Sequence, residues 1–188
     1  QCLTEPGDGV IIQRTVYHTF MHVGQGNGRE LLNSPLRQNS RGRFIMDFDD
    51  LRDKASDPSA KIMILCSPHN PPGRVWEREE LETLVDICAE RNLIIVSDEI
   101  HCDLIYKGVT HIPLPLIKPE YSDRIITCTA PSKTFNLAGL QISNIIIPDE
   151  TLRQKFRKAL MKNGMVDPNS FAAVAMEAAY TYGADWLD

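Results

Sequence analysis

The sequence predicts an α/β fold built on a mostly parallel sheet with helices on both of its faces. Residues 61–66 and 93–97 are almost continuously apolar, which is typical of strands that are covered on both sides. Between them, residues 77–91 carry apolar side chains at helical spacing. A strand, a helix and a strand in this order form a crossover unit, whose two strands pair in parallel with a right-handed turn.

Upstream of this unit, the pattern predicts two short strands and two helices, separated by residues that favour turns. The strands are expected at residues 10–12 and 29–32, and the helices at residues 17–23 and 47–54. Gly24 is expected to end the first helix. Asp47 is the predicted N-cap of the second, because a carboxylate there can accept a hydrogen bond from a free backbone N–H group. Residues 33–43 are polar and predict a loop.

Downstream, the pattern predicts two more strands followed by two helices. The strands are expected at residues 125–128 and 142–147, and the helices at residues 150–161 and 170–182. Residues 107–122 contain three prolines and are interpreted as an excursion from the fold rather than a linker. Helices on both faces of one sheet give a three-layer α/β/α architecture.

Residues 1–188 are predicted to form a single domain without an internal boundary. A chain of this length can bury roughly 70% of the surface that it exposes when unfolded, so a sizeable core is expected. The chain begins without methionine in a turn-like stretch and stops in or just beyond a helix. We therefore interpret it as a piece of a longer protein.

The composition is that of an ordinary globular protein, with 43% hydrophobic and 24% charged residues. The formal net charge of -5 argues against a nucleic-acid partner, which would favour a basic surface. No apolar run reaches 18 residues, and the first residues lack the pattern of a signal peptide. We therefore expect no membrane segment and a cytoplasmic location.

The five cysteines are expected to be free thiols. They are odd in number, contain no CxxC pair, and mostly lie inside apolar strand or helix patterns. The chain offers zinc-ligand residue types at Cys66, His69, His101 and Cys102, but their spacing matches no common set of zinc ligands. No metal site is therefore predicted.

Polar side chains follow three of the predicted strands at the point where each strand ends. They are Asn70, Asp98 and Lys133. Ligands of open α/β sheets bind at the carboxyl ends of the strands, so we expect these three side chains to meet at one edge of the sheet. A lysine there can act as a covalent catalyst.

Three motifs carry a resemblance to a known family. They are SPHNPPG at residues 67–73, SDEIH at residues 97–101 and SKTFN at residues 132–136. Their order and spacing resemble those of the fold-type I pyridoxal-phosphate (PLP) enzymes, in the class I/II aminotransferase-like family and its cystathionine β-lyase or C–S lyase branch. The resemblance covers essentially the whole chain, and implies an incomplete PLP-binding large domain that lacks an N-terminal segment and a C-terminal small domain.

The resemblance implies a role for each motif residue. Lys133 is expected to bond to the cofactor aldehyde and then to move the substrate α-proton. Asp98 is expected to pair with the protonated pyridine nitrogen, which keeps the ring an effective electron sink. The neighbouring Glu99 is interpreted as structural. Asn70 is expected to donate to the phenolic oxygen of the cofactor. The resemblance also implies that the Asn70–Pro71 peptide bond is cis.

Three further residues complete the cofactor-binding set that the resemblance implies. Tyr17 is expected to stack on the cofactor ring, although Val16 replaces the proline that usually precedes this aromatic residue. His101 stands where a tyrosine often donates to the phenolic oxygen, and an imidazole can also donate. Ser132 is the local candidate for binding the phosphate.

Two departures from the aminotransferase pattern lie beside Lys133. Many aminotransferases place a serine three residues before the lysine and an arginine eight residues after it, and both bind the phosphate. This chain has Ala130 and Gln141 at these positions. The loss of a bidentate arginine contact favours the lyase branch, which tolerates the glutamine.

The sequence therefore predicts a PLP-dependent C–S β-lyase that eliminates a thiol from a sulfur amino acid such as cystathionine and yields pyruvate and ammonia. An aminotransferase and a non-catalytic module of the same fold remain the alternatives. A nicotinamide-dependent oxidoreductase is disfavoured, because the glycine run at residues 24–28 follows a helix and precedes a strand, the reverse of the required context. The family implies a homodimer, and implies that this piece alone is inactive because the arginine that binds the substrate carboxylate lies in the small domain.

Overall fold

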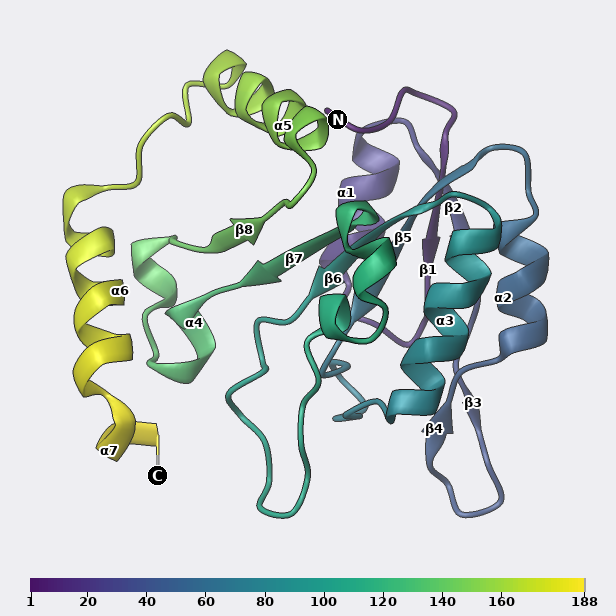
Figure 1. The fold of residues 1–188 in the computed structure, drawn as a ribbon, viewed down its shortest axis with the longest axis horizontal. Coiled ribbons are helices and arrows are strands. Elements are labelled where there is room, and N and C mark those ends of the chain that lie inside the picture. Colours follow the sequence, from purple (N-terminus) through teal and green to yellow (C-terminus); the bar gives the residue numbers. More distant parts are fainter. Residues whose placement is uncertain (188) are drawn as a thin grey trace.

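The computed structural model describes residues 1–187 and is built around one six-stranded sheet with the strand order β2-β1-β5-β6-β7-β8 (Figure 1). The strands from β2 to β7 pair in parallel, and β8 alone is antiparallel to its neighbour β7. The strands are β1 (Gly9–Ile12), β2 (Glu30–Asn33), β5 (Ala60–Cys66), β6 (Ile94–Asp98), β7 (Ile125–Thr129) and β8 (Asn144–Ile146). The prediction of a mostly parallel sheet is confirmed.

Helices connect and follow these strands, and a two-stranded hairpin lies outside the sheet. The α-helices are α1 (Thr19–Gly26), α2 (Phe48–Ala55), α3 (Arg78–Glu90), α4 (Pro131–Thr134), α5 (Glu150–Lys162), α6 (Ser170–Tyr182) and α7 (Ala184–Leu187). The 3-10 helices are η1 (Leu114–Leu116), η2 (Pro119–Arg124) and η3 (Ala138–Leu140), and the hairpin pairs β3 (Arg37–Gln38) with β4 (Phe44–Ile45). None of the helices within residues 1–187 is both long and apolar enough to cross a membrane.

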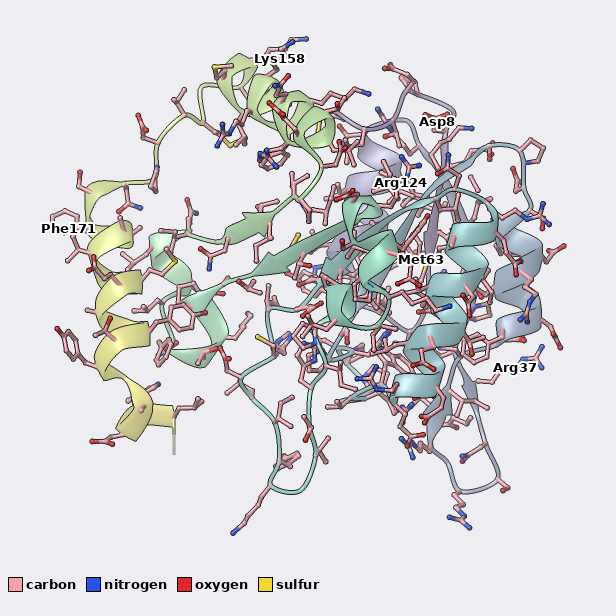
Figure 2. All side chains as sticks on the ribbon, viewed as in Figure 1. Asp8, Arg37, Met63, Arg124, Lys158 and Phe171 are labelled. Carbon is pink, nitrogen blue, oxygen red and sulfur yellow. The ribbon has the colours of Figure 1, made fainter. Side chains whose placement is uncertain are left out.

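The two faces of the sheet are covered by different helices, which confirms the three-layer architecture. Successive strand residues point to opposite faces. In β5, Met63 packs toward α2, α3 and η1, whereas Ile62 packs toward α1 and α5. Figure 2 shows Met63 enclosed by side chains between the sheet and α3. Because apolar residues serve both cores, the strands read as continuous apolar runs.

Local signals place the helices that flank the first core. The Asp47 side chain accepts a hydrogen bond from the Asp50 N–H group at 3.3 Å, as predicted for the N-cap of α2. At α3, Glu77 and Glu80 form a reciprocal capping box. The apolar residues of α3 that recur at helical spacing are buried against the sheet. They are Leu81, Leu84, Val85 and Cys88.

The structure corrects the sequence prediction in three places. Helix α1 begins at Thr19 and ends at Gly26 rather than at Gly24. The expected loop at residues 33–43 contains β3, and the excursion at residues 107–122 contains η1 and η2. Gly24 is buried inside α1, and a side chain there would collide with Leu31. Gly24 therefore serves close packing between α1 and β2.

Candidate active site

Three neighbouring parallel strands, β5, β6 and β7, end at the same edge of the sheet. Asp98 pairs in register with Cys66 on one side and with Cys128 on the other. These three residues alternate with the core residues of the α2–α3 face, so their side chains lie on the face that α1 covers. The connections that leave the three strands bring the motif residues to this corner (Figure 1).

A cavity of about 240 Å³ lies at this corner, and all six residues predicted for the site line it. The lining residues are Tyr17, Cys66, Asn70, Asp98, Ile100, His101, Ser132 and Lys133. The sequence analysis missed Cys66 and Ile100. Cys66 ends an apolar run and was considered only as a zinc ligand, whereas Ile100 is the one apolar residue of the SDEIH motif and carries no polar group that marks it as ligand-binding.

The segment that carries Asn70 is held by the end of β5. The Asn70 N–H group donates to the Cys66 sulfur at 3.4 Å, and the Cys66 thiol donates to the Pro68 carbonyl at 3.4 Å. Burial raises the pKa of the Cys66 thiol to about 12, so the thiol stays protonated and acts as a structural donor. The Asn70–Pro71 peptide bond is cis, as expected.

Asp98 ends β6 and has few partners for a half-buried carboxylate. It accepts a hydrogen bond from the Ile100 N–H group at 3.3 Å, and it forms no salt bridge with another described residue. Desolvation raises the pKa of Asp98, and the nearby charge of Glu99 adds to this shift. A cationic group placed in the cavity would relieve the cost of burying this carboxylate.

Lys133 and Ser132 reach the cavity from α4, a single turn that starts directly after β7. Pro131 occupies its first position, where a missing N–H group costs nothing. Two contacts fasten this turn. The Thr134 hydroxyl donates to Asp103 at 2.8 Å, and the Trp186 indole N–H group donates to the Thr134 carbonyl at 3.2 Å. The Lys133 side chain itself remains exposed to the cavity.

Tyr17 and His101 complete the wall. Tyr17 is 40% exposed and touches His18 and Phe20 edge-on, with ring centroids 4.9 Å and 6.0 Å away. Tyr17 thus combines partial exposure with a place in the cavity lining, where an aromatic ring can stack on a flat ligand. Burial lowers the pKa of His101, and the positive charge of Lys133 lowers it further, so the neutral imidazole is favoured.

Glu99 faces the other side of the sheet and does not line the cavity. It accepts hydrogen bonds from the Ser97 hydroxyl at 2.8 Å and from the Leu114 N–H group at 3.1 Å, and it pairs with His111 at 2.8 Å. These contacts fasten η1 to β6. The interpretation of Glu99 as a structural residue agrees with this geometry.

Ala130 and Gln141 lie outside the cavity lining. Ala130 is buried as the N-cap residue of α4, and Gln141 is exposed with a left-handed backbone, φ +51°. Ser132 is consequently the one residue near Lys133 that offers a hydroxyl to the cavity within residues 1–187. An anion bound here needs further donors from other parts of the protein.

The groups that converge in the cavity suit a flat, charged heteroaromatic ligand. A carboxylate, an amide, a neutral imidazole, a hydroxyl and a primary amine surround the space, and a phenol ring can cover one face. A small-molecule site at the carboxyl edge of a parallel sheet is the arrangement of α/β enzymes that bind cofactors. The fold and the site define the chain as part of such an enzyme.

The chain belongs to the aminotransferase class I and II family, whose model matches residues 1–184. It is 50% identical over 188 residues to the cystathionine β-lyase PatB of Bacillus subtilis (strain 168), across 100% of this chain and 48% of PatB. The family inferred from the three motifs is confirmed. The chain spans about half the length of the curated relatives that it matches.

Two solved structures carry the same fold. Cystalysin from Treponema denticola, which contains a pyridoxal 5'-phosphate cofactor, matches with a TM-score of 0.96 and 39% identity over 99% of this chain and 47% of cystalysin. A PLP-bound putative aminotransferase from Clostridium difficile 630 matches with a TM-score of 0.94 and 44% identity, over 98% of this chain and 47% of that protein. The predicted fold class is confirmed.

Proposed function

We propose that the protein containing this chain is a PLP-dependent C–S β-lyase, which eliminates a thiol from a sulfur amino acid of the cystathionine type and yields pyruvate and ammonia. The observation that carries the proposal is the cavity lined by Tyr17, Asn70, Asp98, His101, Ser132 and Lys133. Its similarity to PatB, at 50% identity, favours lyase chemistry. The glutamine at position 141 favours the same branch.

The residues of the cavity fit the cofactor chemically. Asp98 offers a half-buried carboxylate without a cationic partner among the described residues, which matches a protonated ring nitrogen. Asn70 and His101 can donate to a phenolic oxygen, Ser132 can donate to a phosphate, and the ring of Tyr17 can stack on the cofactor ring. When bound, the cofactor supplies an electron sink for the negative charge that develops at the substrate α carbon.

Lys133 has two roles in this proposal. Its amine would hold the cofactor through a covalent bond, and in the form that is not bonded to the cofactor it would accept the proton from the substrate α carbon. Its position on the short turn α4, fastened through Thr134 and Trp186, limits how far the amine can move. A second hollow of about 400 Å³ adjoins the cavity, shares Asn70 and His101 with it, and gives room for the remainder of a substrate.

An aminotransferase that passes the amino group to a 2-keto acid is the second candidate. The PLP-bound putative aminotransferase from Clostridium difficile 630, 44% identical over this region, favours it. Both reactions need the same six residues through removal of the α-proton. They differ in whether a thiol leaves the β carbon. A non-catalytic module of the same fold is the third candidate.

We propose that residues 1–188 form an incomplete large domain of a longer protein. That protein would also contain an N-terminal segment and a C-terminal small domain. The 48% coverage of PatB supports this arrangement. We also propose a homodimer in the cytoplasm that acts on a small amino acid, with no nucleic-acid or membrane partner. Exposed apolar side chains on α6, such as Phe171 and Val174, support a covered surface in the assembled protein, and free thiols at all five cysteines suit a reducing compartment.

The test uses the full-length protein and its Lys133→Ala variant. We expect wild-type protein to bind PLP and to show the visible absorption band of a lysine-bound cofactor, and we expect the variant to lose the band and at least about 1000-fold in turnover, a barrier increase of about 4 kcal/mol. Lys158→Ala, an exposed lysine on α5 (Figure 2), is the matched control and should keep both. An unchanged spectrum in Lys133→Ala contradicts the assignment.

Product analysis separates the candidate functions. Incubation of the holoenzyme with cystathionine should release pyruvate and a thiol without any added keto acid. Formation of a new amino acid that requires an added 2-keto acid would identify an aminotransferase instead. Absence of both products, with PLP bound, would favour the non-catalytic module.

A further inference from the structure

His69 lies directly before Asn70 but outside the lining of the candidate cavity. It is 1% exposed. No role in binding or proton transfer falls to it in the proposed function. Buried histidines are costly when their ring nitrogens lack partners, so the contacts of this ring indicate what it does.

The imidazole reaches across to the connection between β1 and α1. Its Nε2 atom lies 2.9 Å from the Thr15 carbonyl oxygen. A carbonyl oxygen only accepts, so Nε2 carries the proton and donates. Burial lowers the pKa of His69, which favours the neutral ring with this single donor. The Nδ1 atom is buried without a hydrogen-bond partner among the described residues.

The backbone and the ring of His69 are also held by contacts with residues 73–76. Its N–H group donates to the Arg74 carbonyl at 2.7 Å, and its carbonyl accepts from the Gly73 N–H group at 2.8 Å. The ring stands edge-on to Trp76 at 5.4 Å, and the Trp76 indole donates to the Cys66 carbonyl at 2.9 Å. The imidazole is thereby held to the end of β5.

The connection between β1 and α1, which accepts this hydrogen bond at Thr15, also carries Tyr17 two residues later. Further hydrogen bonds that hold this connection are made at Arg14, whose carbonyl accepts from the Leu36 N–H group at 2.6 Å and whose N–H group donates to the Asn33 side chain at 3.2 Å. The Tyr17 ring is 40% exposed, and its contacts with other aromatic rings are with His18 and Phe20 on its own segment. Its position over the cavity therefore depends on how the backbone of this connection is held.

We infer that His69 is a positioning residue. The hydrogen bond from its Nε2–H group to the Thr15 carbonyl holds Tyr17 in its place in the cavity, which Asn70 and Asp98 also line. The inference rests on the proposed function, in which Tyr17 covers the cofactor ring. His69 does not line the cavity proposed for PLP. It borders the adjoining hollow, where it is 1% exposed. Its effect reaches PLP through Tyr17.

Two amide substitutions separate the donor from the bulk of the side chain. The amide nitrogen of His69→Gln lies as many bonds from Cβ as Nε2 does, so this variant can keep the donor. The amide nitrogen of His69→Asn corresponds to Nδ1 and is too short to reach Thr15. Both variants lose the imidazole and are similarly polar, so each controls for the other.

PLP titration of the full-length apo protein supplies the first measurement. We expect His69→Gln to bind PLP nearly as tightly as wild type and His69→Asn to bind about tenfold more weakly, which corresponds to about 1.4 kcal/mol. In a Tyr17→Ala background, His69→Asn should cause little further loss, because the two substitutions remove the same contribution. A purely structural role predicts additive losses, and additive losses would overturn the inference.

Amide hydrogen exchange of the apo protein supplies a measurement that does not depend on PLP. His69→Asn should speed exchange over residues 15–18, and His69→Gln should leave it near the wild-type rate. If wild-type protein binds no PLP, the proposed function fails, and exchange still decides on His69. Unchanged exchange in His69→Asn overturns the inference.

Discussion

Asp98 and Glu99 are adjacent carboxylates at the end of β6, but they lie on opposite faces of the sheet and differ in how many hydrogen-bond partners they have. On the α2–α3 face, Glu99 is 1% exposed and has three partners, Ser97, His111 and Leu114. On the α1 face, Asp98 has a single hydrogen bond at 3.3 Å and a raised pKa. One carboxylate is satisfied by the fold, and the other is not.

This difference separates a structural acid, Glu99, from the acid that is proposed to meet the cofactor, Asp98. Glu99 fastens η1 to β6 and leaves no capacity for a ligand. The desolvation of Asp98 is offset only by the hydrogen bond from the Ile100 N–H group, a cost that a fold can tolerate at a binding site, and the proposed cofactor would supply the missing positive charge. Substitutions at the two positions should therefore change the free energy of unfolding in opposite directions.

Glu99→Ala should give the largest effect. It removes the acceptor for the Ser97 hydroxyl and the Leu114 N–H group, and the partner of His111. Buried polar groups left without partners each cost about 1–3 kcal/mol, so we expect a loss of about 3 kcal/mol in the free energy of unfolding. Urea denaturation monitored by circular dichroism measures it. Glu99→Gln keeps one carbonyl acceptor and should lose less.

The contrast between the faces breaks down if Glu99→Ala is as stable as wild type. The same holds if Glu99→Gln and Glu99→Ala are equally destabilised, because the loss would then come from the change in charge rather than from the hydrogen bonds. A large loss in the alanine variant with a partial loss in the glutamine variant supports the assignment.

The sequence predicted that the motif residues would meet, and the structure places them around one cavity, whereas several short elements nearby were not predicted. Asn70, Asp98 and Lys133 each follow a strand, and parallel strands that end at one edge must bring such residues together. The apolar runs of β5 and β6 were recognisable because both faces are covered. Short elements such as β3 and η1 carry too little pattern to be recognised.

Other features depend on tertiary contacts that no local pattern encodes. β8 runs antiparallel to β7 because residues 130–143 contain only short helical turns, α4 and η3, rather than a helix long enough to cross the sheet. Cys66 lines the cavity through its place in the register beside Asp98. The hydrogen bond between His69 and Thr15 joins residues 54 positions apart. Each of these required the folded arrangement.

Asp98→Asn should stabilise the ligand-free protein while it weakens PLP binding. The folded-state pKa of Asp98 is raised above the reference value of 3.8, so the folded protein binds a proton more readily than the unfolded chain. Ionisation therefore destabilises the fold as pH rises through this interval. We expect a gain of about 1 kcal/mol at pH 8, or a melting temperature higher by about 2–4 °C.

The pH dependence identifies the cause. Well below pH 3.8 the carboxyl is protonated in both states, so the gain from Asp98→Asn should vanish there, and it should reach its full size well above the folded-state pKa. Thermal melts of the apo protein at acidic and alkaline pH measure both limits. A variant that is less stable than wild type at pH 8 would show that Asp98 supports the fold as Glu99 does.

The smallest expected effects come from two serines that lie on the two sides of the comparison. Ser97 is fully buried and donates to Glu99, whereas Ser132 lines the cavity and its hydroxyl has no hydrogen-bond partner among the described residues. Ser97→Ala should cost about 1 kcal/mol because it removes one satisfied hydrogen bond. Ser132→Ala should change the free energy of unfolding by less than about 0.5 kcal/mol.

For PLP affinity we expect the opposite ranking of the two substitutions. Ser132→Ala should weaken PLP binding several-fold if its hydroxyl meets the phosphate, an effect of about 1 kcal/mol, and Ser97→Ala should leave PLP affinity unchanged. Chemical denaturation of apo protein and PLP titration of the same two variants give all four values. Equal changes in both measurements for both serines would mean that stability and binding are not divided between the two faces of the sheet. A crossed pattern would show that the α2–α3 face holds the fold while the α1 face keeps its polar groups free for the ligand.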